Sequence, residues 1–229
     1  MTRTGTALGA AWPSMLAVAH TSGWSAALTA LHAAAGPGVV VLGPAGHALV
    51  PDEVAADADR LRQGEWEWAP DDTVEHLNTG VPGLTALRAR RPANAVRVPE
   101  ARSWNTALAG LRLGLSYRLL EGALRYLDQR HTGDVVLLQH SVVKSAVADV
   151  VMEQLQVRCA LEGAEPDGLD AAAVADLHAQ ITAMDRAGVR LLGAHGYVEG
   201  GPGTAVHVSE LLADAYRAGS GSTPGGFDE

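Results

Sequence analysis

Residues 103–130 read SWNTALAGLRLGLSYRLLEGALRYLDQR, a stretch that contains no proline. Its large apolar side chains recur at the spacing of helical turns, at Leu108, Leu111, Leu115, Leu119 and Tyr126. This period matches the 3.6-residue turn of an α-helix, so the stretch predicts one long helix with an apolar stripe. The segment Arg130-His131-Thr132-Gly133-Asp134 follows, and its glycine predicts that the helix ends there.

Three more helical segments follow this one. The second has an apolar stripe made of Val142, Val143, Ala146, Val150 and Leu155, and ends near residues 163–168. The third starts at Asp170, an expected N-cap, and reaches Leu191. The fourth is short and covers Val208–Tyr216, after a glycine-rich stretch at 193–197. Three long helices and a shorter one indicate an antiparallel four-helix bundle over residues 103–217.

The preceding residues, 1–102, predict a reduced α+β region. Residues 1–37 are rich in alanine and predict one or two amphipathic helices, which end at Gly36-Pro37-Gly38. Val39–Leu42 and Ala48–Val50 flank a Gly-Pro-Ala-Gly turn, so we expect a short hairpin there. Short strands and loops follow, and all five tryptophans precede residue 105, which supports a boundary near residue 100. The fold class is therefore mainly α, and the Gly/Ser/Pro-rich tail at 218–229 is expected to be disordered.

Composition excludes several classes of function. The net charge of −9 argues against a nucleic-acid binder, which usually presents a basic face. The chain has one cysteine, Cys159, so no internal disulfide can form and we expect a reducing, cytoplasmic setting. Cys159 falls in an apolar helical pattern, which predicts a buried thiol. No run of about eighteen apolar residues is present, so no membrane-spanning helix is expected.

Nine histidines raise the question of a metal site. None of them forms an HxH, HxxxH or HExxH pair, so no metal ligands are predicted. No Walker A pattern occurs. The Gly193–Gly196 segment follows a predicted helix, whereas the dinucleotide fingerprint follows a strand, so it is not read as one.

Three landmarks in the bundle occur together and in order. Arg130 ends the first long helix, Gln139 opens the next with Lys144 and Ala148-Asp149 along it, and Leu191-Leu192-Gly193-Ala194-His195-Gly196-Tyr197 follows the third. Over residues 103–217 this arrangement resembles the C-terminal helical domain of acyl-CoA dehydrogenases.

The resemblance implies FAD as cofactor, bound at an interface between subunits. It assigns the flavin contacts to Arg130, Gln139, Gly193, Ala194 and Gly196. These residue types suit that role, because glycine lets backbone N–H groups approach a pyrophosphate and arginine offers paired donors to phosphate oxygens. The other interpretation is a helix-terminating turn beside a solvated arginine, which complements the helix dipole.

The catalytic base of the resembled family is not evident. Counting back from Pro202, the expected base position is Gly200, and Glu199 is the candidate one residue away. A shift of one residue moves a carboxylate by about 3.5 Å, which matters because a general base must reach the proton it removes. The second position at which the family places this base falls on Trp104, which cannot act as one.

Two hypotheses of a dehydrogenase function remain open, and so does a third hypothesis, of a function without flavin. The chain is either a divergent subunit that acts with a full-length dehydrogenase, or itself an oxidoreductase on the CH–CH bond of an acyl-CoA or carrier-bound acyl thioester. We expect a homo- or hetero-oligomer in either case. The alternative is a non-catalytic interaction or assembly protein that retains the bundle without flavin. The missing base and the short region before the bundle favour the divergent subunit.

Overall fold

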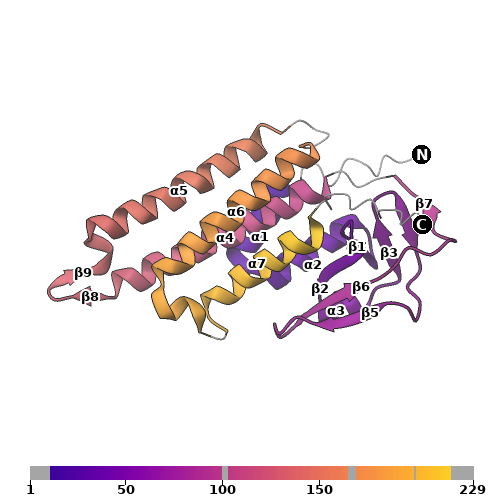
Figure 1. The fold of residues 1–229 in the computed structure, drawn as a ribbon, viewed down its shortest axis with the longest axis horizontal. Coiled ribbons are helices and arrows are strands. Elements are labelled where there is room, and N and C mark those ends of the chain that lie inside the picture. The colour runs from indigo at the N-terminus through magenta and orange to yellow at the C-terminus, as the bar shows by residue number, and fades with distance from the viewer. Residues whose placement is uncertain (1–10, 100–102, 165–168, 199, 218–229) are drawn as a thin grey trace, which may run out of the picture.

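The computed structural model describes residues 11–99, 103–164, 169–198 and 200–217. Within them, helices form one end of an elongated molecule and most strands the other (Figure 1). The helices are α1 (Trp12–Ser22), α2 (Trp24–Ala35), α3 (Asp52–Ala56), α4 (Trp104–Asp128), α5 (Ser141–Glu162), α6 (Ala171–Leu191) and α7 (Pro202–Tyr216). Short 3-10 turns, η2 (Leu137–Gln139) and η3 (Gly193–Tyr197), precede α5 and α7. None of the described helices is long and apolar enough to cross a membrane.

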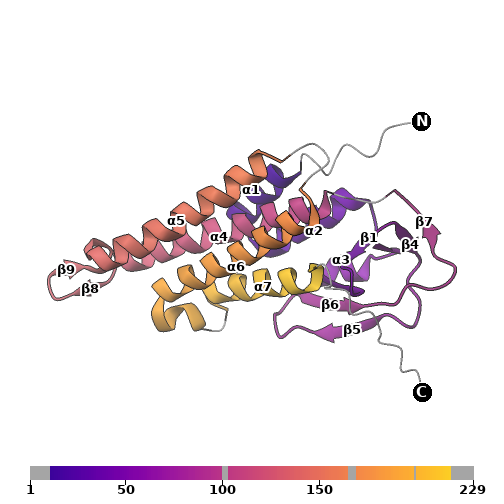
Figure 2. The same ribbon diagram turned by 45° about the horizontal axis from the view of Figure 1, so that its top comes forward.

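Helix α4 is the centre of the bundle, and it confirms the long helix predicted from residues 103–130. It contacts α1, α2, α5, α6 and α7, and an unbroken run of its residues, 106–116, is buried. This run has no solvent face, so both its leucines and its small residues are packing positions. The predicted mainly α fold with a C-terminal four-helix bundle is therefore confirmed, with α1 and α2 packed onto the same bundle (Figure 2).

Two glycines of α4 let α1 approach its backbone closely. A Cβ atom added at Gly110 would lie 2.6 Å from the Trp12 carbonyl oxygen. One added at Gly114 would lie 2.3 Å from the Leu16 carbonyl oxygen. Both distances are far below contact distance, and both partners are backbone atoms that cannot move away alone. Glycine is therefore required at these two positions by packing, despite its low helix propensity.

The apolar stripe predicted for α5 is right for Val143, Ala146 and Val150, which are half-buried or buried, and wrong for Val142 and Leu155. Val142 and Leu155 are exposed, at 79% and 52%, whereas the buried positions are Val150, Gln154, Val157 and Leu161. Helix α5 lies on the outside of the bundle and packs against α4 and α6. Only the narrow face that contacts these two helices is buried. Its apolar residues outside that face stay in solvent. Cys159 is also exposed, so its predicted burial is wrong.

The strands form two sheets at the other end and a separate hairpin. The first sheet has the order β1–β3–β4–β7 and the second β2–β6–β5. Their strands are β1 (Val39–Leu42), β2 (His47–Pro51), β3 (Arg60–Gln63), β4 (Trp66–Trp68), β5 (Glu75–Asn78), β6 (Leu84–Arg88) and β7 (Val96–Arg97). The hairpin, β8 (His131–Thr132) with β9 (Val135–Val136), follows α4.

The predicted hairpin between residues 39–42 and 48–50 is wrong. Strand β1 pairs in parallel with β3, and β2 pairs antiparallel with β6, so the turn between them leads from one sheet into the other. At this turn a Cβ on Gly43 would lie 1.9 Å from the Ala215 carbonyl oxygen of α7. The turn is thus packed against the bundle.

One hydrophobic core contains residues from both sides of residue 102. Met15 and Leu28 belong to it together with Leu108 and Leu212. His32, on α2, is 2% exposed at its edge, and burial lowers its pKa to about 4. The division of the chain at residue 102 stays a prediction, and this shared core describes how the two parts meet.

We expect Gly114→Ala to lower the free energy of unfolding by about 1–3 kcal/mol, because the added methyl group meets the α1 backbone. Gly122→Ala is the matched control on the same helix, since no atom lies within 4 Å of its added Cβ. It should raise stability by about 0.5–1 kcal/mol through helix propensity. Urea unfolding measures both, and equal effects of the two substitutions would contradict the close α1–α4 contact.

We expect the stability of the protein to depend on His32 between pH 6.5 and about 4. In the unfolded chain this histidine takes up a proton below its ordinary pKa of 6.5, while the buried ring stays neutral until about pH 4. Acidification therefore favours unfolding, by about 1.4 kcal/mol per pH unit from this one group. In His32→Phe the plot of unfolding free energy against pH should lose that slope. An unchanged slope would show that His32 is protonated in the folded protein.

Candidate functional site

Arg130 lies directly after α4 with its guanidinium in solvent. The guanidinium carbon lies 4.8 Å from the centre of the Tyr126 ring, and Nη2 donates to the Tyr126 hydroxyl at 2.6 Å. The spacing of four residues places the two side chains on one face of the helix end. Arg130 forms no ion pair with any carboxylate of the described residues. Its charge and most of its five donors therefore remain open to an external anion.

The Tyr126 ring also joins Arg130 to the glycine-rich turn. His195 of η3 stacks on Tyr126 with ring centres 4.6 Å apart and the planes tilted by 7°. Helix α4 and the turn after α6 are thus connected by a row of three side chains, Arg130, Tyr126 and His195. We call this row the Arg130 stack. It brings together two of the three landmarks that the sequence singled out.

The glycine-rich turn has an exposed part and a buried part. Gly193 and Ala194 are exposed, and Gly193 has a positive φ of 55° with open space where a Cβ would stand. Gly196 is buried, and a Cβ there would lie 2.7 Å from Val189 Cγ2. The start of α7 also passes close by, since a Cβ on Gly203 would lie 2.0 Å from the Gly196 carbonyl oxygen. Gly193 and Ala194 can therefore present backbone to a ligand, whereas packing explains Gly196.

Gln139 lies at the same end of α4. It is exposed and closes η2, and the Leu137 N–H of that turn donates to the Arg130 carbonyl oxygen at 2.7 Å. Gln139 does not open α5 as predicted, because the helix begins at Ser141 with His140 as its N-cap. The 3-10 turn intervenes because the N–H of His140 bonds back to Leu137 at 3.1 Å.

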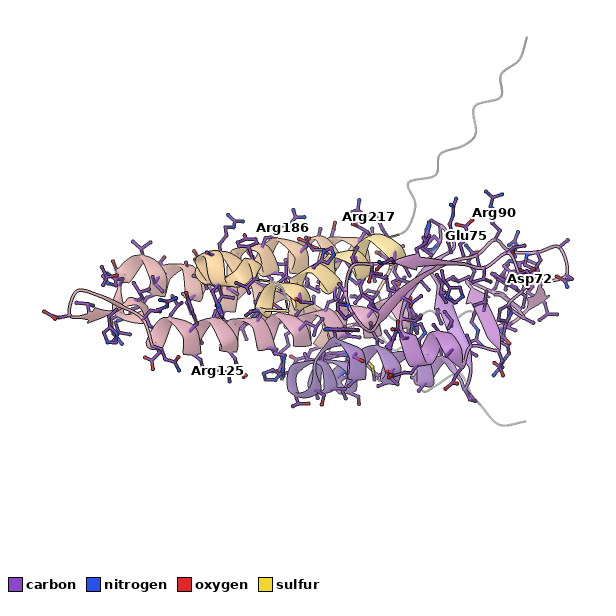
Figure 3. All side chains as sticks on the ribbon, turned by 90° about the horizontal axis from the view of Figure 1, so that it is seen from below. Asp72, Glu75, Arg90, Arg125, Arg186 and Arg217 are labelled. Atoms are coloured by element: carbon purple, nitrogen blue, oxygen red, sulfur yellow. The ribbon has the colours of Figure 1, made fainter. Side chains whose placement is uncertain are left out.

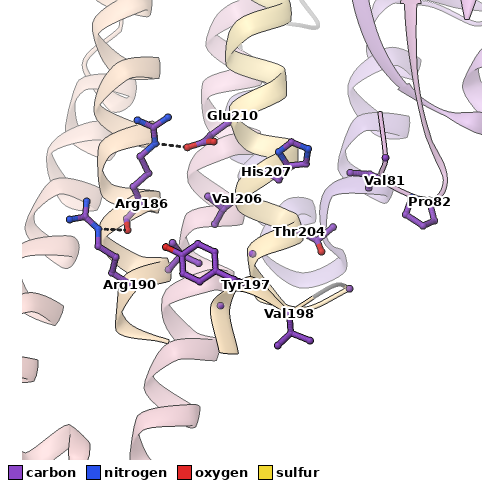
Figure 4. A pocket seen from close by; sticks show the side chains of 15 residues that line it. Val81, Pro82, Arg186, Arg190, Tyr197, Val198, Thr204, Val206, His207 and Glu210 are labelled. Carbon is purple, nitrogen blue, oxygen red and sulfur yellow. Dashed lines mark hydrogen bonds and ion pairs between the residues drawn. The ribbon is translucent and has the colours of Figure 1, made fainter. Parts of the chain in front are cut away.

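A cavity of about 770 Å³ lies beside η3, and we call it the η3 cavity. Its walls come from the ends of α6 and α7, from Gly196 to Val198, and from the β5–β6 turn at Val81 and Pro82 (Figure 4). The lining is mostly apolar, with the guanidinium groups of Arg186 and Arg190 and the His207 ring at its edges. Arg186 Nε donates to Glu210 Oε1 at 2.6 Å, and Arg190 Nε donates to the Arg186 carbonyl oxygen at 3.0 Å. The η3 turn thus contributes His195 to the Arg130 stack and Gly196 to the wall of this cavity.

The second base position predicted from the sequence carries no base in the structure. Trp104 is buried, with its rings 4.9 Å from His32 and 5.6 Å from Tyr216 between centres. It lines a cavity of about 690 Å³ between the first sheet and the bundle. Glu65 also lines that cavity, but its carboxylate accepts a hydrogen bond from Arg97 Nη2 at 2.6 Å. The other candidate, Glu199, lies outside the described residues.

A flavin dinucleotide, which the resemblance implies, can be compared with these groups. The exposed guanidinium of Arg130 and the exposed backbone at Gly193 and Ala194 suit the phosphate edge of such a cofactor. They form an open surface, not an enclosure for the ring system. The described residues therefore fit one edge of the cofactor. They also hold no group of three or more His, Cys, Asp or Glu side chains that could bind a metal ion.

Comparisons with known proteins gave structural matches alone. No protein-family model and no curated protein matches the chain. Among solved structures, the Tcur3481–Tcur3483 steroid ACAD variant is similar with a TM-score of 0.60 and 20% identity, over 81% of this chain and 60% of that one. The ChsE4–ChsE5 complex from Mycobacterium tuberculosis follows with a TM-score of 0.57 and 16% identity, over 92% of this chain and 70% of that one.

Butyryl-CoA dehydrogenase from Megasphaera elsdenii is similar at a TM-score of 0.51 and 15% identity, over 81% of this chain. The chain spans 60% of the first of these structures and 61% of the butyryl-CoA dehydrogenase. At such identities the likeness establishes the fold alone. The chain therefore has an acyl-CoA dehydrogenase-like fold, which corresponds to part of those enzymes.

Proposed function

We propose that the chain is a divergent acyl-CoA dehydrogenase-type subunit that acts with a full-length dehydrogenase partner. In the assembly, the end of α4 and the η3 turn supply one edge of a flavin site. The observation that carries this proposal is the Arg130 stack, in which Arg130, Tyr126 and His195 join two separate segments into one exposed surface. Bound FAD would supply the hydride acceptor for oxidation of an acyl thioester. The residues of this chain bind one edge of the cofactor and orient it.

The electrostatics of the stack support binding of a phosphate edge. Tyr126 holds the Arg130 guanidinium over its ring and accepts one of its hydrogen bonds, which limits the rotamers that the long side chain can adopt. An arginine that is already oriented loses less side-chain entropy when it engages a phosphate in two parallel hydrogen bonds. Gly193 and Ala194 are exposed in the same turn as His195, so we assign them the backbone contacts. Gln139, at the same end of α4, is the proposed third contact.

Two observations support a second subunit. Two of the similar structures are named for pairs of proteins, Tcur3481–Tcur3483 and ChsE4–ChsE5. In addition, the described flavin-edge groups lie on an open surface, which suits a cofactor held mainly by another chain. In this proposal the partner binds the acyl-CoA or carrier-bound acyl thioester and provides the catalytic base.

A second candidate function is assembly without flavin. It is favoured by helix α5, where Val142, Met152 and Leu155 expose 79%, 55% and 52% of their surface. Exposed apolar side chains on an outer helix can contribute to a protein interface. A protein of this class would bind its partner through the bundle and leave the partner's flavin content and activity unchanged.

Co-expression with full-length acyl-CoA dehydrogenases from the same genome tests the proposal. We expect this chain to co-purify with one of them as a yellow complex and to be colourless when it is expressed alone. A yellow protein from this chain alone would support an autonomous flavin site instead. A colourless chain that leaves the activity and flavin content of every such dehydrogenase unchanged would refute both flavin-based functions.

We expect Arg130→Ala to weaken flavin retention by the complex about tenfold or more, because a charge-assisted hydrogen bond contributes about 1.5–3 kcal/mol. Arg125→Ala is the matched control, since Arg125 is an exposed arginine in the last turn of the same helix (Figure 3). Flavin absorbance after dialysis measures retention, and thermal unfolding verifies the fold. Equal retention in the two variants would remove Arg130 from the flavin site.

We expect Glu199→Gln to leave the dehydrogenase turnover of the complex within about twofold of its starting value. Removal of a true general base slows a reaction by about 10²–10⁴-fold, so the two outcomes are well separated. Steady-state turnover with a saturating acyl-CoA measures the effect. A fall of that size in a folded variant would identify Glu199 as the base.

A further inference from the structure

A third cavity lies between α6 and α7, separate from the flavin-edge surface formed by the Arg130 stack and the η3 turn. It has a volume of about 610 Å³ and begins near Asn105. We call it the α6–α7 groove; it shares two lining residues, Arg186 and Glu210, with the η3 cavity. Small side chains make much of its surface, at Ala175, Ala179, Ala183 and Ala213. The volume lies in the range of about 300–1,000 Å³ that is typical of small-molecule sites.

One wall of this groove is held by a buried arginine. Arg112 of α4 has no exposed surface, and its guanidinium reaches both α6 and α7. It donates to Ser209 Oγ at 3.0 Å and to Thr182 Oγ1 at 2.8 Å. It also engages His178 twice, with Nη1 2.9 Å from the ring Nδ1 and 3.0 Å from the carbonyl oxygen. A buried cation must have its donors satisfied, so this network holds His178 in one orientation.

The network also determines which nitrogen of His178 carries the proton. A guanidinium has donors and no acceptor, so His178 Nδ1 must accept and is unprotonated. The proton of the neutral ring therefore lies on Nε2. Burial, and next the charge of Arg112, lower the His178 pKa to about 3, so the ring stays neutral at physiological pH. His178 presents a permanent Nε2–H donor.

This donor has no hydrogen-bond partner among the described residues. His178 is only 7% exposed and lines the groove, and its Nε2 atom is covered by protein, so binding requires a small opening of the groove at this ring. A buried donor without a partner is unfavourable, and a ligand with an acceptor oxygen would satisfy it. The orphaned Nε2–H and the groove thus point to the same ligand feature.

The charges around the groove disfavour an anionic ligand, and an N–H donor offers no acceptor to a cation. Glu210 is paired with Arg186 at 2.6 Å, and Asp214 is paired with Arg217 at 3.3 Å. The Tyr216 hydroxyl donates to the Val41 carbonyl oxygen at 3.0 Å and is satisfied. Asp176 adds a carboxylate to the lining, which would repel an anion. Alanine and valine make up most of the remaining lining, together with the uncharged side chains of Asn105 and Thr182. This part of the groove suits the hydrocarbon portion of a neutral molecule.

We propose that the α6–α7 groove binds a neutral, apolar molecule with a carbonyl group, whose oxygen accepts a hydrogen bond from His178 Nε2–H. The alanine-lined part of the groove holds the hydrocarbon portion. Ketones and uncharged amides belong to this chemical class. The site uses α6, α7 and the start of α4, so it stands apart from the Arg130 stack and from flavin.

The test compares 2-octanone with 1-octene, which has the same number of carbon atoms and no acceptor oxygen. NMR titration of the whole chain, with the imidazole nitrogens of His178 observed by long-range ¹H–¹⁵N correlation, reports both affinity and tautomer. We expect saturable binding of 2-octanone, a shift of the Nε2 resonance, and about fivefold or more preference over 1-octene. No saturable binding, or binding without a change at His178, would overturn the proposal.

Two variants distinguish the contribution of the His178 hydrogen bond from that of the volume of the groove. In His178→Asn the Oδ1 atom can take the place of Nδ1 as acceptor for Arg112, while the Nε2 donor is lost. The preference for 2-octanone should then fall to about onefold. Ala183→Leu fills the groove without touching the Arg112 network, and it should weaken both probes. Retention of the preference in folded His178→Asn would contradict the assigned donor. Because no flavin or partner takes part, these results are independent of the proposed subunit role.

Discussion

The close contact between α1 and α4 is the constraint on which the rest of the structure depends. Gly110 and Gly114 remove the side chains that would hold the two backbones apart, so α1 lies directly on α4. With this face covered by α1 and the others by α5, α6 and α7, residues 106–116 of α4 are enclosed on all sides. Only an enclosed segment can carry a residue such as Arg112, which has no exposed surface and connects three helices. The packing of α1 thus indirectly shapes the polar interior of the bundle.

Helices α4 and α6 could be predicted from the sequence because their signals are local. Both have an apolar period of 3.6 residues without proline, and the Asp170 side chain accepts the Ala173 N–H at 2.7 Å, as expected of an N-cap. The buried face of α5 could be predicted only in part, because apolar residues occur on more than one face of this helix. The hairpin at 39–50 failed for a different reason. Its strands pair with residues 60–63 and 84–88, and a local turn pattern contains no information about those partners.

The residues of the candidate site could be predicted from the sequence, but their arrangement in space could not. Arg130, Gln139 and the glycine-rich turn could be named from their order along the chain. The contact through Tyr126 and His195 depends on how α6 runs along α4, which no spacing reveals. The Arg112 network was missed because an arginine between leucines resembles a solvated helix position. Its partners Thr182, His178 and Ser209 come from helices that lie more than sixty residues away along the chain.

The position of α1 has a consequence for the order in which the protein can fold. Helix α1 comes early in the chain, and the glycines that receive it belong to α4, which is synthesised only after both sheets. Until α4 has left the ribosome, Met15, Leu28 and Leu31 have no surface of the bundle to pack against. Contacts between distant segments form late because the intervening loop must first be closed. The core is therefore completed only after α4 has been made, and the apolar faces of the early helices stay exposed until then.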